Sequence, residues 1–528
     1  MENNDQTAKE TVRTRFPPSP TGPLNPGGVR TALFAYLFAK RYGGSFILRI
    51  EDTDIERSKK EWDQDILESM KWLGLNWDEG PNPNIGKDGK KYIGEYGPYR
   101  QSERKAIYAG YLKKLIEEEK AYYCFCSKEE LESYKQYAMS QGLPPVYPGK
   151  CRDLDQATIQ KYLDEKRPFL IRFKTPKGQK ITFDDAVRGK VEFDSTLLGD
   201  FSLSKGFDNP LYNFVVVIDD YEMKITDVVR GEDHIPNTPK QILLQEALGL
   251  SRVRYAHLPL ILNEKRQKLS KRDNVLPISA YKKEGYFPEA LNNFVALLGW
   301  NPGTEKEVFS LEQLTKEFSV EKIQKAGAIF NPQKLDWLNG FYIRQKPLKE
   351  LTKLCVPYLE ERGLIKKNEK MTRPENELLP EISYSVIATG ENVFEDYLEN
   401  AVALYKERLK KLSEIGDLVD FFFVGKLDYP AEMLKWKKMS SDQELIDSLE
   451  KCQKILSSVE EKDFTRENLE KILLKEAEAM PDRGYLLWPL RVALTGKMNS
   501  AGPIDITAVL GKQKTLQRIE QAMNKIIK

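Results

Sequence analysis

The sequence predicts a parallel α/β domain that is interrupted by an inserted α+β segment and followed by a half made mostly of helices. Residues 12–55 alternate between strand, helix and strand, and the same alternation resumes at about residue 206. The stretch between them, 106–205, has a mixed composition that breaks this alternation. From about residue 275, nearly every segment has apolar residues at helical spacing.

The opening strand–helix–strand unit is defined by its turn. A short strand leads into a proline- and glycine-rich turn at 17–28, and a helix is expected over 29–42, where Gly43-Gly44 ends it. A second strand follows at 46–50. Because two strands joined by such a crossover pair in parallel, this unit favours a parallel sheet.

The second part of the α/β domain is expected to add three strands and a helix. Apolar runs at 211–219, 225–229 and 257–262 are typical of buried strands. A helix with a proline in its first turn is expected through 241–248. A polar, basic loop at 263–273 follows the last of these strands.

The bulk properties suit a large globular protein. Its 528 residues are too many for one core, and 82 Lys plus Arg against 80 Asp plus Glu give a net charge of only +2. This balance neither demands nor excludes a polyanionic partner. No apolar run approaches the ~20 residues of a membrane span, residues 1–10 lack a signal sequence, and five cysteines do not form a disulfide scaffold. A reducing cytoplasm and no membrane partner are therefore expected.

Two segments have the chemistry of phosphate binding. The turn 19–28 stands before a helix, where glycines let the backbone approach a ligand and free N–H groups face it. The loop Lys268-Leu269-Ser270-Lys271-Arg272 offers cations that can stabilise a charged phosphoryl group as it reacts. Each has an ordinary alternative, a structural turn in the first case and a solvated basic loop in the second.

Taken together and in order, the motifs resemble the class I glutamyl-tRNA synthetases of the bacterial type, over about residues 12–525. The motifs are Ser-Pro-Thr-Gly-x-Leu-x-x-Gly-Gly from Ser19, Arg-Ile-Glu-Asp-Thr-Asp from Arg49, Gly-Pro-Tyr-Arg-Gln-Ser-Glu-Arg from Gly97, Val-Val-Arg-Gly-Glu-Asp-His from Val228, Lys-Leu-Ser-Lys-Arg from Lys268, Trp-Leu-Asn-Gly-Phe-Tyr-Ile-Arg from Trp337 and Leu-Arg-Val-Ala-Leu-Thr-Gly from Leu490. Several independent motifs in register make a chance resemblance very improbable.

The resemblance implies four regions. It implies a Rossmann-type catalytic domain made of 12–105 and 206–262, with an inserted acceptor-binding domain at 106–205. A stem-contact helical region that carries the lysine loop would span 263–345, and an α-helical anticodon-binding region 346–528. The glutaminyl-tRNA synthetases, the nearest rival, usually carry β-barrel anticodon domains, and the C-terminal part of this sequence lacks recurrent alternating strands.

The resemblance also implies a two-step reaction. L-glutamate attacks the α-phosphate of ATP, which acts with Mg²⁺, to give glutamyl-adenylate and pyrophosphate, and a hydroxyl of the terminal adenosine of tRNA(Glu) then takes the glutamyl group. Neither step needs a covalent enzyme intermediate, so positioning and charge neutralisation suffice. The family is usually monomeric. Whether the enzyme also charges tRNA(Gln) is left open.

Residue roles follow from the resemblance, position by position. A glutamate ligand carries two carboxylates and one ammonium, so its pocket needs at least two cations and one anion. One alternative for this set is that Arg15 and Glu51 simply pair with each other. The matching positions are Arg15, Ser19, Glu51, Tyr212 and Arg230 for glutamate, Gly27, Gly28 and Lys271 for ATP, and Asn25, Lys268, Ser270 and Lys271 for catalysis.

One motif departs from the family pattern. The family's His-Ile-Gly-Gly is replaced here by Asn25-Pro26-Gly27-Gly28. Asn25 keeps a neutral donor but cannot become cationic, and Pro26 removes one backbone N–H. Either Asn25 donates to phosphate with reduced efficiency, or the chain is a catalytically weakened paralogue that only binds tRNA. Because losing one donor typically costs ~10²–10³ in rate, an active enzyme is favoured.

Three clustered cysteines predict a zinc site in the inserted domain. Cys124, Cys126 and Cys151 supply three of the four ligands of a tetrahedral site. Comparison with the family offers two oxygens for the fourth position, Tyr147 and Asp153. The alternative is three buried free thiols.

The tRNA is expected to contact basic residues of the C-terminal half, because phosphate contacts set much of the affinity of RNA-binding proteins. Clusters at 406–411 and 435–438 are candidates, although solvated helix faces are the commoner explanation of each. Arg408 falls near the position at which the family reads an anticodon base.

Overall fold

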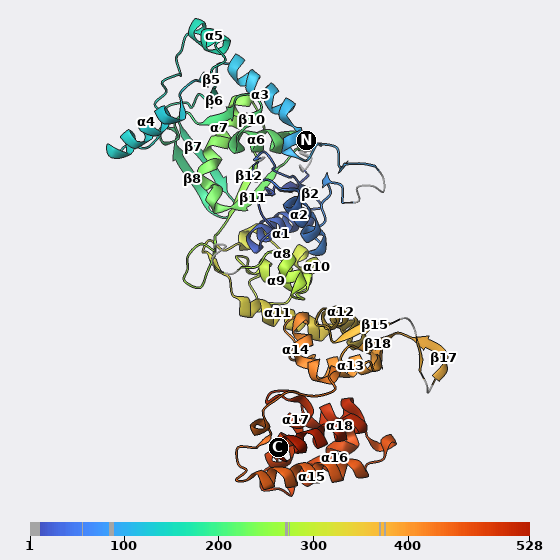
Figure 1. Cartoon of the computed structure of the whole chain (residues 1–528). Helices are drawn as coiled ribbons and strands as arrows, with labels where there is room; N and C mark the ends of the chain where they lie inside the picture. The colour runs from blue at the N-terminus through green and yellow to red at the C-terminus, as the bar shows by residue number, and fades with distance from the viewer. Residues whose placement is uncertain are drawn as a thin grey trace, which may run out of the picture. The chain divides into compact units, whose positions relative to one another are not determined.

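The computed structural model describes residues 11–527 apart from 55, 84–88, 270–272, 274, 369–370 and 374–375, and within 371–381 it describes the backbone alone (Figure 1). The chain divides into two compact units. The first runs up to Lys282 and includes Pro288–Leu335. The second consists of Lys283–Phe287 and the chain from Asp336 onward. Among the described helices, none combines the length and the apolar character that a membrane span requires.

A six-stranded sheet forms the core of the first unit. All neighbouring strands pair in parallel except the last pair, which is an antiparallel hairpin. Because the carboxyl ends of parallel strands meet at one edge, this edge gathers the loops that follow them. In sheet order the strands are β2 (Ser45–Leu48), β1 (Arg13–Phe16), β11 (Asp227–Gly231), β12 (Arg254–Leu258), β7 (Lys180–Asp185) and β8 (Gly189–Asp194).

Helices cover this sheet. Helix α1 (Pro26–Arg41) connects β1 to β2 and packs against both, with Val29, Leu33 and Leu37 fully buried at helical spacing. The side-chain hydroxyl of Thr14 donates to the carbonyl of Ala35 over 2.8 Å, and this hydrogen bond connects β1 to α1. The other helices of this part are α2 (Lys60–Trp72), α3 (Lys105–Glu117), α6 (Tyr212–Glu222) and α7 (Thr238–Leu248).

The strand expected at 211–219 is wrong, because this segment forms helix α6. Every residue from Phe214 to Asp220 is buried, so the segment shows no alternation of apolar and polar positions. A short run that is apolar all round does not distinguish a buried strand from a buried helix. The three consecutive valines, which favour strands, do not outweigh the packing of α6 against α7 and α3.

The inserted region expected at 106–205 contributes strands to two sheets. Strands β7 and β8 lie within 106–205, yet they extend the main sheet through the parallel pairing of β7 with β12. Figure 1 shows this hairpin running beside β12 and β11. A separate antiparallel sheet contains three further strands of the region, β9 (Ser202–Lys205), β6 (Leu170–Phe173) and β5 (Ala121–Cys124), and is completed by β10 (Asn209–Pro210) just after it. The region also holds helices α4 (Lys128–Ser140) and α5 (Gln156–Asp164).

The remainder of the first unit packs on the other side of α1. Helix α1 contacts α9 and α10, and a two-stranded parallel ladder joins β13 to β14. The elements are β13 (Ile261–Leu262), α8 (Ile278–Lys283), α9 (Pro288–Ala296), α10 (Leu311–Glu317) and β14 (Ala328–Ile329), with a short ladder of β3 (Gly80–Pro81) and β4 (Tyr92–Ile93) elsewhere in the unit.

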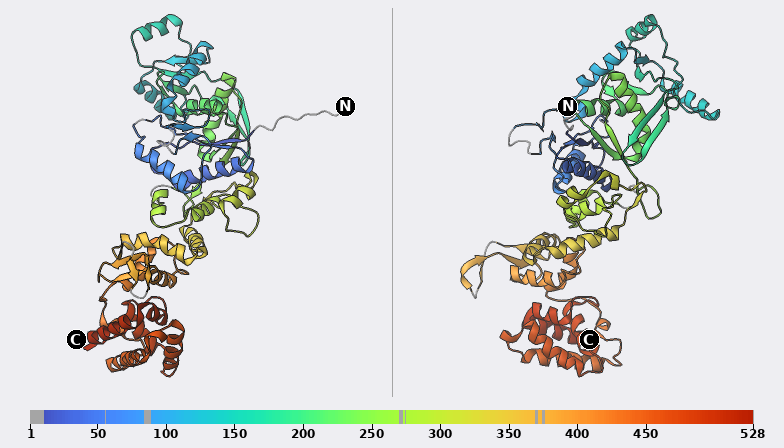
Figure 2. Two further views of the ribbon diagram at one scale, coloured as in Figure 1. Left: turned by 90° about the vertical axis from the view of Figure 1, so that its right-hand side faces the viewer. Right: turned by 180° about the vertical axis from the view of Figure 1, so that it is seen from behind.

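The second unit is largely helical, as expected, but it also contains short strands. Its last four helices lie side by side in both views of Figure 2. The helices are α11 (Pro332–Gln345), α12 (Leu348–Glu361), α13 (Glu395–Ala403), α14 (Ile415–Val419), α15 (Asp442–Ser458), α16 (Arg466–Glu478), α17 (Gly484–Thr495) and α18 (Pro503–Ile527). The strands are β15 (Ile365–Lys367), β16 (Met371–Arg373), β17 (Asn376–Glu381), β18 (Ser383–Val386) and β19 (Asn392–Phe394).

Candidate active site

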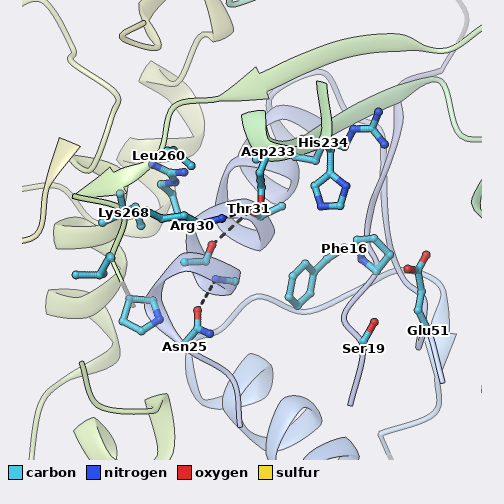
Figure 3. A pocket seen from close by; sticks show the side chains of 18 of the residues that line it. Phe16, Ser19, Asn25, Arg30, Thr31, Glu51, Asp233, His234, Leu260 and Lys268 are labelled. Atoms are coloured by element: carbon cyan, nitrogen blue, oxygen red, sulfur yellow. Dashed lines mark hydrogen bonds and ion pairs between the residues drawn. The ribbon is translucent and has the colours of Figure 1, made fainter. Parts of the chain in front are cut away.

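A pocket of about 590 Å³ opens at the carboxyl edge of the parallel strands. β1 and β11 each contribute their last residues, and the turn before α1 forms one wall. Figure 3 shows Glu51 and Ser19 at one end of the pocket and Asn25 and Lys268 at the other, with the ring of Phe16 between them. The structure brings together nine of the residues predicted from the sequence, namely Arg15, Ser19, Asn25, Gly27, Gly28, Glu51, Tyr212, Arg230 and Lys268. Ser270 and Lys271 lie outside the described residues.

Arg15 and Glu51 line the same pocket, and each has its own partner. The Nε of Arg15, which is 1% exposed, donates to Oδ1 of Asp220 over 3.1 Å. Arg49 contacts the same carboxylate at 2.7 Å and Glu51 at 3.1 Å. The alternative in which Arg15 and Glu51 merely pair with each other is therefore wrong. The Nη1 of Arg15 is buried and has no hydrogen-bond partner among the described residues, so it can receive a ligand's carboxylate.

Behind this end of the pocket lies a second carboxylate, that of Asp219, which is fully buried. It accepts hydrogen bonds from Arg104 Nε at 2.7 Å, Tyr108 at 2.9 Å and Gln101 at 2.8 Å. Arg49 Nε lies 3.8 Å from it. Together the buried group has three guanidiniums, of Arg15, Arg49 and Arg104, and three carboxylates, of Glu51, Asp219 and Asp220, so its charges cancel. Buried ions are tolerated when they are paired in this way.

Arg230 differs from these arginines because its partners are neutral. Its Nε donates to His257 Nε2 at 3.1 Å, Nη1 to Gln241 at 2.9 Å and Nη2 to Thr238 at 2.8 Å. The residue is 5% exposed, and none of the described side chains bonded to it is a carboxylate. Arg230 thus places at this end of the pocket a buried positive charge that none of the described side chains bonded to it neutralises, which favours an anionic group of a ligand here.

A further pair of side chains completes this wall. The hydroxyl of Tyr212 lies 3.0 Å from Nδ1 of His234. Burial, together with the positive charge of Arg230, lowers the pKa of His234 to about 4, so this imidazole is neutral at neutral pH. The uncompensated positive charge at this end of the pocket therefore resides on Arg230 and not on the histidine.

At the opposite end, Asn25 has a structural role that its motif did not reveal. Its Oδ1 accepts from the backbone N–H of Gly28 at 3.0 Å and caps helix α1, while Pro26 has no N–H. Val29 donates to the carbonyl of Asn25. Among the described first-turn N–H groups, only that of Gly27 remains for a ligand. A Cβ on Gly28 would lie 3.0 Å from the Cδ1 of Leu24, so a larger residue there would make that side chain shift.

Two cations border this end of the pocket. Lys268 forms an exposed ion pair with Asp233 at 3.2 Å. Arg30, which sequence reasoning missed, is buried and donates Nη1 to the carbonyl of Leu298 and Nη2 to that of Pro259. Burial lowers its pKa to about 10, so it is still protonated at neutral pH. Its place one turn into the helix that follows the glycine-rich turn is the signal that could have identified it.

The three clustered cysteines lie together in the inserted region. The sulfur atoms of Cys124, Cys126 and Cys151 lie within 4.8 Å of one another, and those of Cys126 and Cys151 are 3.6 Å apart. The hydroxyl oxygen of Tyr147 is 3.4 Å from two of these sulfurs and accepts from the backbone N–H of Cys151. Hydrogen bonds from Cys151 and Tyr147 lower the pKa of Cys124 to about 4. Asp153 is exposed and is not part of this group of described residues.

These spacings fit a tetrahedral zinc site. Zinc–sulfur bonds of ~2.3 Å and a zinc–oxygen bond of ~2.0 Å place ligand atoms about 3.5–3.8 Å apart. The observed sulfur–sulfur and sulfur–oxygen distances of 3.6 and 3.4 Å are close to these values. Of the two oxygens offered by the sequence, only that of Tyr147 lies beside the sulfurs.

Comparison with known proteins agrees with this geometry. Residues 11–337 match the model of the catalytic domain of class I tRNA synthetases (E and Q). The glutamate–tRNA ligase 1 of Caldicellulosiruptor saccharolyticus is 44% identical over 517 residues, which is 96% of this chain and 98% of that protein. The chain belongs to the class I glutamate–tRNA ligases. It is accordingly an aminoacyl-tRNA synthetase, and the resemblance seen in the sequence is confirmed.

Further comparisons cover the whole length of the enzyme. The glutamate–tRNA ligase of Aquifex aeolicus is 40% identical over 523 residues, 98% of this chain and 99% of that protein. A crystal structure of a glutamate tRNA ligase from Elizabethkingia meningosepticum in complex with its amino acid is 35% identical, covers 98% of this chain and 100% of that chain, and has a TM-score of 0.83. Residues 350–523 match an anticodon-binding domain. The predicted fold class, a class I catalytic domain followed by a helical anticodon-binding half, is confirmed.

Proposed function

We propose that the enzyme joins L-glutamate to tRNA(Glu) at the expense of ATP, through a glutamyl-adenylate. The observation that carries this proposal is Arg230, a buried cation held only by neutral partners beside a charge-balanced group that contains Arg15 and Glu51. Glutamate, with two carboxylates and one ammonium, has the net charge of −1 that this pocket lacks. Glutamine is neutral overall and would leave the cation of Arg230 unpaired.

The pocket suggests how each group of the amino acid is held. The carboxylate of Glu51 faces the α-ammonium, and the free Nη1 of Arg15 and the guanidinium of Arg230 take the two carboxylates. Ser19 and Tyr212 line the same space and supply hydroxyl groups. Charge-assisted hydrogen bonds from arginine to carboxylate are the strongest available for such a ligand.

ATP is proposed to occupy the end of the pocket near α1. Its phosphates would meet the N–H of Gly27 beside Gly28, the amide of Asn25 and the cations of Arg30 and Lys268. Ser270 and Lys271, outside the described residues, are proposed to act on the phosphates from the same loop. Mg²⁺ accompanies ATP in class I synthetases and neutralises phosphate charge.

In the first step, an oxygen of glutamate's α-carboxylate attacks the α-phosphorus, and pyrophosphate leaves with the electrons of the broken P–O bond. In the second, a terminal ribose hydroxyl of the tRNA attacks the acyl carbon, and AMP leaves. The side chains hold the reactants in line and offset negative charge as it shifts toward the leaving phosphates.

An ATP–pyrophosphate exchange assay tests this function. We expect exchange with glutamate and at least about 30-fold lower kcat/KM with glutamine, since a buried cation left without its partner costs ~2–5 kcal/mol. The assay is run with and without tRNA(Glu), because many family members activate the amino acid only with tRNA present. Exchange that prefers glutamine would support the glutaminyl enzyme, and tight tRNA binding without any exchange would support the non-catalytic paralogue.

Asn25 gives a first testable prediction. Replacing it with alanine removes the cap of α1 and is expected to lower the free energy of unfolding by about 1 kcal/mol. Replacing it with aspartate keeps an acceptor for the N–H of Gly28 but sets a negative charge toward the phosphates, so stability should hold while KM for ATP rises at least tenfold. Urea unfolding and exchange kinetics measure the two effects. Equal KM values for ATP in both variants would contradict a phosphate site at Asn25.

Zinc binding gives a second testable prediction. We propose that Cys124, Cys126, Tyr147 and Cys151 hold one Zn²⁺, which would fix the local fold of the inserted region. Elemental analysis of the purified enzyme is expected to find about one zinc per chain, and Cys151→Ser should lose it. The matched control is Asp153→Ala, which should retain the metal. Loss of zinc in that variant, or no zinc in the wild-type enzyme, would contradict the proposed ligand set.

The tRNA contact at Arg408 stays a prediction. Arg408 is exposed, and its Nη1 donates to the carbonyl of Ser500 over 3.0 Å within the anticodon-binding half. We propose that the remaining donors of this guanidinium face the tRNA anticodon. A monomeric state and a cytoplasmic location are likewise proposed by analogy with the family.

A further inference from the structure

Arg230 is positioned by a buried pair that reaches it from a distant part of the sequence. His257 Nε2 lies 3.1 Å from Arg230 Nε, and His257 Nδ1 lies 2.6 Å from Oδ2 of Asp185. His257 and Asp185 side chains are both fully buried. Asp185 ends β7, the strand that the inserted region adds to the main sheet, and it lies opposite Tyr255 in the pairing with β12.

The geometry determines which nitrogen of His257 carries the proton. An arginine Nε is always a donor, so the Nε2 that faces it must accept. The proton is therefore on Nδ1, which donates to Asp185, and the carboxylate of Asp185 is fixed in turn by the backbone N–H groups of Val187, Arg188 and His257. Burial lowers the pKa of His257, which agrees with a neutral ring.

Arg15 and Arg230 are thus each held through their own Nε atom, but by partners of different charge. Asp220, a carboxylate, binds Nε of Arg15 and offsets its charge, whereas His257 binds Nε of Arg230 through a neutral nitrogen. A carboxylate at position 257 would also accept from the guanidinium, but it would offset the charge of Arg230 and would lie beside the carboxylate of Asp185. The neutral imidazole leaves the positive charge of Arg230 uncompensated at this end of the pocket.

We propose that His257, oriented by Asp185, is a positioning residue that sets the preference for glutamate over glutamine. It holds the guanidinium of Arg230 in place and leaves that positive charge available to the substrate's second carboxylate. The inference rests on the proposed function, because it takes Arg230 to contact that carboxylate.

Two variants of the full-length enzyme test the role of position 257. His257→Gln offers a neutral acceptor to Arg230 and is expected to keep the ratio of kcat/KM for glutamate over glutamine within about threefold of wild type. His257→Glu offers a carboxylate instead. We expect it to raise KM for glutamate roughly 100-fold with a much smaller change in kcat, and to lower the glutamate-to-glutamine ratio by a similar factor.

The readout is ATP–pyrophosphate exchange with each amino acid, with KM for ATP and the melting temperature as controls. A purely structural role would lower kcat/KM for both amino acids equally in both variants, and that result would overturn the proposal. So would a His257→Glu enzyme that folds and keeps its preference. If His257→Glu does not fold, His257→Gln still tests the proposal. A loss of the preference for glutamate over glutamine in that variant would contradict the role of position 257 as a neutral acceptor. Failure of the proposed function would give a different result, because the wild-type enzyme itself would then show no exchange with glutamate.

Discussion

Replacing Arg230 with glutamine is expected to lower kcat/KM for glutamate by about 10²–10³-fold. The guanidinium is 5% exposed and bonds only neutral groups, so most of its charge is available to the ligand. Without it, a carboxylate of glutamate would be buried with no cation, which costs ~2–5 kcal/mol. Glutamine brings no second carboxylate, so its kcat/KM should change little. Exchange kinetics with both amino acids measure the two effects.

A matched control comes from the loop before β12. Arg252→Gln removes an exposed guanidinium, 51% accessible, that pairs with Glu246, and its kinetics should stay within about threefold of wild type. KM for ATP should not change in the Arg230 variant, because the nucleotide end of the pocket lies at Asn25 and Lys268. If Arg230→Gln reduced activity with glutamate and glutamine alike, Arg230 would support the fold of the pocket and would not recognise the substrate's charge.

The residues that line the pocket could be predicted because they stand in motifs at strand ends. Arg15 is the last residue but one of β1 and Arg230 the last but one of β11, and the carboxyl edge of a parallel sheet brings such positions together. The family resemblance singled these residues out, and the parallel order of the sheet explains why they share one pocket. The capping role of Asn25 could also have been predicted, because asparagine before a proline at the start of a helix is a common N-cap.

The partners that hold these residues could not be predicted, because they depend on long-range pairing. Asp220 meets Arg15 across 205 positions of the chain, and Asp185 meets His257 across 72. The first contact exists because 212–222 is a helix, which the all-round apolar pattern did not reveal. The second exists because β7 joins the main sheet, and nothing in the local pattern of 180–185 says which sheet the strand will enter.

The buried ion group predicts a large stability effect at Asp220. Replacing Asp220 with asparagine is expected to lower the free energy of unfolding of the first unit by about 3–5 kcal/mol, because the buried Arg15 loses the carboxylate that pairs with it and the buried Arg49 loses the nearest of its carboxylate partners. Urea unfolding followed by fluorescence measures it. The control Glu246→Gln breaks an exposed pair with Arg252 and should cost no more than ~1 kcal/mol.

The effect of Asp220→Asn should also depend on pH in a definite direction. Burial alone would raise the pKa of Asp220, but the guanidiniums of Arg15 and Arg49 outweigh it and hold the pKa below its ordinary value. A carboxyl whose folded-state pKa is depressed contributes its full stability above the unfolded pKa of ~3.9 and loses it as the pH falls through the folded-state pKa. The difference in the free energy of unfolding between wild type and Asp220→Asn should therefore be constant from pH 5 to 8. It should become smaller in stronger acid. A difference of the same size in strong acid, where the carboxyl of Asp220 is protonated, would contradict the view that the charge of Asp220 supplies this stability.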